Sequence, residues 1–232
     1  MKEKPAGSPT PEEKELDPTG KASADRNVSQ IVRKVFAFTA QHGGFGMQTI
    51  DALHEKVPPS ICKMSGNCCF SIRMYSIEYH RIITYLCENF SVDEITEFIR
   101  RTLDPSDRIA RYGEDVRYRC VFLHPETKKC RIYHARPFMC RAFGHGFFGQ
   151  VECPHVAVAT PTTTEHYVGV SGRVASVSEQ FHVATDEGLE PMEAFPFEFW
   201  LRRAIDGSEK ALDWFQETHF YKKYTNRDRS AR

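Results

Sequence analysis

Apolar residues along this chain recur at helical spacing, in short runs that polar, glycine or proline residues separate. A return of apolar side chains every three or four positions predicts helices over residues 28–40, 47–56 and 77–90. A further helix is expected over residues 92–103. Ser91 stands at its N-cap and Glu94 follows three residues later, which is the pattern of a capping box.

The second half of the chain predicts shorter and more mixed elements. A short helix is expected over residues 132–143, with Pro137 in its first turn, where the missing amide is tolerated. Residues 167–184 are rich in β-branched side chains and are interrupted by Gly172, so they predict a β-hairpin. Two amphipathic helices should follow, over residues 196–205 and 211–221.

These elements predict a mainly α fold, a single small domain over residues 28–224. Its middle is irregular and cysteine-rich, and no regular element is expected between residues 62 and 76. Residues 1–27 contain no aromatic side chain and many charged, proline and glycine residues, so we expect a disordered tail. Residues 225–232 are polar and are expected to fray.

Charge and hydropathy then limit the possible partners. The 31 basic residues balance the 31 acidic ones, so the chain has no overall charge that would attract nucleic acid or an anionic membrane. No apolar run approaches the roughly 18 residues of a membrane span. The first residues lack the apolar core of a secretory signal. We therefore expect a cytoplasmic protein whose thiols stay reduced.

Cysteines carry the most specific chemical signal of the chain. Thiolates are soft, charged ligands that suit zinc or the iron of an iron–sulfur cluster. Adjacent side chains of an extended loop point in opposite directions, so Cys68 and Cys69 either serve two centres or divide into one ligand and one packed thiol. Cys87 stands among apolar residues and is expected to be a core thiol. The other seven of the eight cysteines form a spaced series and are the candidate metal ligands: Cys62, Cys68, Cys69, Cys120, Cys130, Cys140 and Cys153.

Three pieces of this series carry a family resemblance. They read CKMSGNCC over residues 62–69, CVFL over 120–123 and CRIYHARPFMCRAF over 130–143. Together they resemble the YkgJ-type cysteine-cluster proteins, a CxxCxxCC family described as zinc- or iron-chelating. The resemblance extends over residues 62–153 and implies that the cysteines hold zinc or an iron–sulfur cluster. The family also resembles the flagellin lysine methylases, whose similar cysteines are linked to an iron–sulfur cluster.

Two positions depart from the family pattern. Ser65 stands where the family has its second cysteine, and Gly144 replaces a proline. Seven thiols then remain where eight would build two four-cysteine sites. One interpretation is a second, open centre, as a catalytic metal requires, completed by Ser65, by water or by a histidine. The other is a single centre with the surplus thiols buried. The neighbouring histidines are His124, His134, His145 and His155.

Basic residues surround the same segment. We expect Arg136 and Arg141 to offset the negative charge of metal-bound thiolates and to donate hydrogen bonds to sulfur. A pocket for an anionic substrate is the alternative. Three hypotheses for the function follow: a metal-binding protein, a metal-centre enzyme that modifies a protein or small molecule as a methylase does, and a structural-zinc scaffold for a protein partner. The sequence leaves the metal, the substrate and the oligomeric state open.

Overall fold

The structure is a computed structural model, and helices make up most of the residues that it describes. The mainly α prediction is thereby confirmed. The described residues are 30, 33, 47–57, 60–62, 69, 72–104, 119–142, 156–158, 164–185 and 194–217. The expected tails, 1–27 and 225–232, lie outside these residues, as does the helix predicted over 28–40 apart from the helical residues 30 and 33. The helices are α2 (Met47–Glu55), α3 (Ser76–Asn89), α4 (Val92–Leu103), the short 3-10 turn η2 (Tyr133–Ala135), α6 (Phe138–Ala142), α7 (Thr164–Thr185), α8 (Phe197–Asp206) and α9 (Ser208–Glu217).

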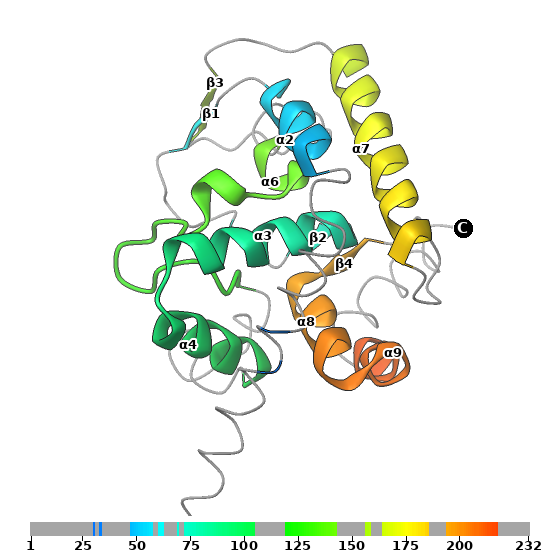
Figure 1. Cartoon of the computed structure of the whole chain (residues 1–232). Helices are drawn as coiled ribbons and strands as arrows, with labels where there is room; N and C mark the ends of the chain where they lie inside the picture. The colour runs from blue at the N-terminus through cyan, green and yellow to red at the C-terminus, as the bar shows by residue number, and fades with distance from the viewer. Residues whose placement is uncertain are drawn as a thin grey trace, which may run out of the picture.

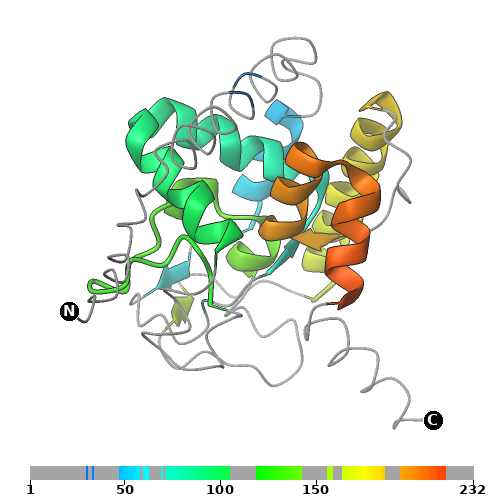
Figure 2. The same cartoon turned by 90° about the horizontal axis from the view of Figure 1, so that it is seen from below.

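Helix α3 crosses the middle of the molecule and separates two groups of helices (Figure 1). In that view α2, α6 and α7 lie above it, and α4, α8 and α9 lie below it. Helix α8 packs on α9, and the two lie side by side when the molecule is seen from below (Figure 2). Helix α3 contacts members of both groups and so links them.

Two clusters of buried side chains correspond to these two groups. The upper core draws on α2, α3, α6 and α7, and Ile77 is the α3 residue buried in it. The lower core is aromatic and includes Phe98, Phe122 and Phe199. Ile82 and Leu86 of α3 belong to that lower core. Helix α3 is therefore buried on more than one side, as its dense apolar sequence requires.

Helix α4 begins where the sequence places it. The Ser91 hydroxyl accepts a hydrogen bond from the backbone N–H of Glu94, and the Glu94 carboxylate accepts the backbone N–H of Ser91 in return. These two backbone N–H groups have no carbonyl acceptor within the helix, and the two side chains supply their hydrogen-bond acceptors instead. The capping box expected from these two residues is confirmed.

Two small antiparallel sheets tie distant parts of the chain together. Strand β1 (Ser60–Cys62) pairs with β3 (Val156–Val158), and β2 (Arg73–Met74) pairs with β4 (Phe195–Pro196). The second pair corrects one expectation, because residues 73–74 lie in the stretch predicted to be irregular. Trp200 reinforces this contact by donating its indole N–H to the carbonyl of Met74, at 2.9 Å.

The hairpin predicted over residues 167–184 is wrong, because this segment lies within the 22-residue helix α7. Its buried side chains are Tyr167, Val170, Val174, Ser178 and Phe181, which recur every three or four residues. This spacing places them on one helical face against α2 and α3. Burial of that face outweighs the β preference of the valines.

The last two helices confirm the predicted pair. A sharp corner at Gly207, with φ of +90°, separates α8 from α9. That backbone conformation favours glycine, which has no Cβ. Residues 218–221, the end of the second predicted helix, lie outside the described part of the chain. Among the helices that the structure describes, none is both long and apolar enough to cross a membrane.

Candidate metal centre

Four of the candidate cysteines lie among the described residues and are not joined in disulfides: Cys69, Cys120, Cys130 and Cys140. The last three belong to the stretch 119–142, and the backbone ties this stretch to Cys69, because the N–H of Cys120 donates to the carbonyl of Cys69 at 3.0 Å. The short helix α6 carries Cys140. Residues far apart in the sequence therefore approach one another at this place.

A tight turn brings Cys130 back beside the segment that follows Cys120. The N–H of Arg131 donates to the Phe122 carbonyl at 2.9 Å, and Leu123 forms an isolated bridge with Cys130. Lys128 takes a positive φ of 56° at the corner. This turn holds the two cysteines on adjacent stretches of backbone.

The thiols of Cys130 and Cys140 lie close enough to that of Cys120 to affect its ionisation. Burial is the largest cause that raises the pKa of Cys120 well above its ordinary value. Negative charge on Cys130 and on Cys140 raises it further, because neighbouring like charges disfavour a second thiolate. Such a group of thiols favours the approach of a cation, which offsets their charge when they ionise.

The side chains as they stand do not complete a metal site. Within the described part of the chain, no three Cys, His, Asp or Glu side chains converge closely enough to hold a metal ion. Cys68, Cys153 and the side chain of Cys62 lie outside the described residues. The backbone of Cys62 belongs to β1 and pairs with Val156 of β3.

Two of the four candidate histidines fall within the described residues. The Nδ1 atom of His124 accepts the backbone N–H groups of Glu126 and Thr127, at 3.3 and 3.2 Å, so the turn uses this nitrogen. His134 is exposed, and its ring lies edge-on to Tyr133. His145, His155 and Ser65 lie outside the described residues.

Cys87 stands apart from this group. It lies on α3, half-buried against the lower core, as the apolar residues around it predict. Burial raises the pKa of its thiol, and the adjacent Glu88 carboxylate adds to that effect. In such surroundings we expect the thiol of Cys87 to be unreactive.

The two predicted arginines lie on the turn that leads into α6 and within α6 itself. Arg136 donates from Nε to the Tyr133 carbonyl at 3.0 Å, and its guanidinium stacks 3.7 Å from the centre of the Tyr133 ring. Arg141 donates from Nε to the carbonyl of Arg136 at 3.2 Å. Burial lowers the pKa of Arg141 to about 10, and negative charge on Cys140 acts in the opposite direction. The hydrogen bonds described for these two arginines go to backbone carbonyls, and the expected bonds to sulfur stay a prediction.

Three charged residues near these groups escaped the sequence analysis. Arg81 of α3 donates to the carbonyl of His134 and forms an ion pair with Asp51 of α2. Glu198 of α8 is 7 % exposed, and its carboxylate is among the charges that raise the pKa of Cys120. One sequence signal existed for Glu198, an acidic residue inside the aromatic run FPFEFW. Arg81 and Asp51 offer no such signal, because only the packing of α2 on α3 brings them together.

Comparison with known protein families identifies this region. Residues 61–157 match the family model "CxxCxxCC: Putative zinc- or iron-chelating domain". The family resemblance is confirmed for this segment. The match includes all seven cysteines of the series, and it covers less than half of the 232-residue chain. Neither the comparison with curated proteins nor the comparison with solved structures gives a match. The family description supports metal binding, with zinc or iron as the metal.

Proposed function

We propose that this protein binds zinc or iron through thiolates of its cysteine series, and that the iron form holds an iron–sulfur cluster. The observation that carries the proposal is the proximity of Cys130 and Cys140 to Cys120, three thiols spaced ten residues apart inside the matched domain. Thiolate ligands suit both metals. The proposal requires a reducing compartment, such as the cytoplasm, where the thiols remain available.

The described backbone supports a division of the ligands between two groups. We assign Cys69, Cys120, Cys130 and Cys140 to the first group, whose four sulfurs would have to draw together on metal binding to form a closed tetrahedral zinc site or to hold a four-iron cluster. The remaining candidates, Cys62, Cys68 and Cys153, are assigned to the second group. With Ser65 in place of a cysteine, this second group has three thiols.

The bound metal would supply either folding free energy, as a structural zinc does, or electron-transfer chemistry, as a cluster does. The chain's own residues would prepare the site for it. The backbone hydrogen bond between Cys120 and Cys69 fixes the separation of two segments, and the guanidinium of Arg141 stabilises a negative charge on Cys140.

Metal analysis of the full chain, purified without oxygen, tests the proposal. We expect stoichiometric iron or zinc, with acid-labile sulfide when iron is present. An absorption spectrum separates the two forms, because zinc–thiolate sites are colourless and iron–sulfur clusters absorb in the visible range. A protein that contains neither metal at a stoichiometric level would refute the proposal.

Substitution of single cysteines tests the ligand assignment. Cys140→Ser should reduce the bound metal to less than half of the wild-type content per chain, because serine is a poor replacement for a thiolate on zinc or iron. Cys87→Ser is the matched control, since this half-buried thiol packs against the lower core instead. Equal metal content in the two variants would contradict the assignment of Cys140.

A further inference from the structure

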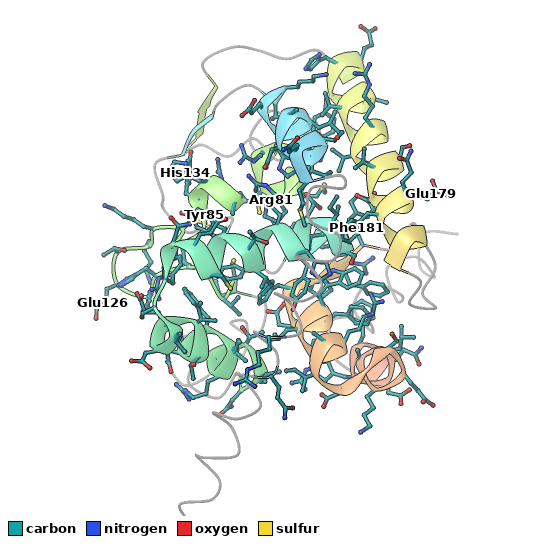
Figure 3. All side chains as sticks on the ribbon, in the orientation of Figure 1. Arg81, Tyr85, Glu126, His134, Glu179 and Phe181 are labelled. Carbon is teal, nitrogen blue, oxygen red and sulfur yellow. The ribbon has the colours of Figure 1, made fainter. Side chains whose placement is uncertain are left out.

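Two guanidinium groups meet at the backbone carbonyl of His134, beside the cysteine group but with no cysteine ligand among them. Arg81 donates from Nη2 to this oxygen at 3.2 Å, and Arg141 donates from Nη2 to it at 2.6 Å. A third guanidinium, that of Arg136, lies on the adjoining turn, where it donates to the Tyr133 carbonyl, and the Arg136 carbonyl accepts Nε of Arg141. These three arginines are called the arginine cluster. Figure 3 labels Arg81 on α3 and His134 on the neighbouring η2 turn.

Positive charge exceeds negative charge in this cluster. A guanidinium group stays protonated at neutral pH, so Arg81, Arg136 and Arg141 each carry a positive charge. Among the described residues, the carboxylate paired with the cluster is that of Asp51, which is half exposed and pairs with Arg81. One carboxylate cannot balance three guanidinium groups.

The donors of the cluster are incompletely used and partly open to solvent. Nη1 of Arg81 is buried and has no hydrogen-bond partner. The two hydrogen bonds to the His134 carbonyl lie at exposed positions, so an anion can reach the same N–H groups from solvent. A charged oxygen accepts such bonds about twice as strongly as a neutral carbonyl.

We propose that Arg81 and Arg141 form a binding site for a phosphoryl dianion, with Arg136 on the adjoining turn adding positive charge. A dianion matches the uncompensated charge of the cluster more closely than a monocarboxylate does. The guanidinium groups of Arg81 and Arg141 come from α3 and α6 and meet at one carbonyl oxygen, so they can bind different oxygens of one phosphate. The site goes beyond the proposed metal binding, because its ligands are arginines and its occupant is an anion.

Calorimetric titration of the full, metal-containing chain tests this inference. Inorganic phosphate and glycerol phosphate are titrated separately at constant ionic strength, with acetate as the monoanion for comparison. We expect saturable binding of one phosphate per chain and weaker binding of acetate. Tighter binding of glycerol phosphate would identify a phosphate ester as the ligand, and tighter binding of phosphate would identify the free ion.

Variants locate the site. Arg81→Gln and Arg141→Gln should each weaken phosphate binding about tenfold or more, because each removes a charge-assisted hydrogen bond. Asp51→Asn should tighten it, since this carboxylate competes with phosphate for Arg81. Arg202→Gln is the matched control. Arg202 is also partly buried and also donates to a backbone carbonyl, that of Leu103, but it stacks on Trp214.

Two results would overturn the inference: no saturable binding of phosphate or its ester to the wild type, or equal affinity in the wild type, Arg81→Gln and Arg141→Gln. Arg81→Lys replaces Arg81→Gln if the latter does not fold, and it should still weaken binding because it loses the planar donor pair. Metal content is measured for every sample. Phosphate binding without metal would refute the metal proposal alone, and metal without phosphate binding would refute this inference alone.

Discussion

Glu78 is the buried carboxylate on which three helices depend. It lies on α3 and is 1 % exposed. One of its oxygens, Oε1, accepts the backbone N–H of Phe138 at 2.6 Å, at the start of α6, and the other accepts that of Tyr75 at 3.0 Å. The ring of His54, from α2, places Nε2 3.2 Å from Oε1, although neither ring nitrogen reaches hydrogen-bond geometry. Substitution at this one position therefore tests how α2, α3 and α6 are held together.

Glu78→Gln should reduce the free energy of unfolding by about 2–4 kcal/mol. Each hydrogen bond between a buried carboxylate and a backbone N–H contributes about 1.5–3 kcal/mol. Glutamine keeps one oxygen and places an NH2 group where the other stood, so one of the two amides loses its acceptor and faces a donor. Since domains of this kind unfold at a total cost of about 5–15 kcal/mol, the loss is a large fraction of the whole.

Urea denaturation followed by circular dichroism measures this change, with wild type and variant at the same metal content. Glu88→Gln, an exposed position on the same helix, is the control and should change stability by no more than about 0.5 kcal/mol. A loss under about 1 kcal/mol for Glu78→Gln would refute the reasoning. Because α6 carries Cys140 two residues beyond Phe138, we also expect less bound metal in this variant.

Three further predictions follow from the core, the α4 cap and the proposed metal. Phe199→Ala should lower the free energy of unfolding by about 3–5 kcal/mol, because the Phe199 ring is fully buried and its centre lies 3.8 Å from that of Phe195. Urea denaturation measures the change, and a loss below about 1 kcal/mol would contradict the packing. Hydrogen bonds from Ser91 and the charge of Arg131 lower the pKa of the Glu94 carboxyl group. The ionised Glu94 therefore stabilises the fold at pH values above 4.5, the ordinary pKa of the group, and this stabilisation is lost as the pH falls through the lowered pKa. The difference in urea midpoint between wild type and Glu94→Gln should therefore shrink in acid, and a constant difference would contradict this. Removal of the metal with a chelator should lower the Tm, because the proposed metal–thiolate bonds would connect distant parts of the chain. An unchanged Tm in protein shown to have lost its metal would contradict a structural role.

Local chemistry made much of the fold predictable. The α4 cap needs only Ser91 and Glu94, which are three residues apart, so the sequence predicts it fully. Helices α3 and α8 follow from periodic apolar positions in the same way. The error at α7 shows the limit of this reasoning, because residue preference favoured strands there while the buried face, which the packing on α2 and α3 selects, required a helix.

The sequence by itself determined which atoms are available for metal binding, because the spacing and identity of the cysteines are visible in it and match a chelating family. Only the tertiary structure decided which groups become neighbours. Cys120 lies near Glu198, and Arg81 shares a carbonyl oxygen with Arg141, across separations of about 60 residues or more. The reason is that helical periodicity acts over a few residues, whereas contacts between helices depend on how all their buried faces pack together.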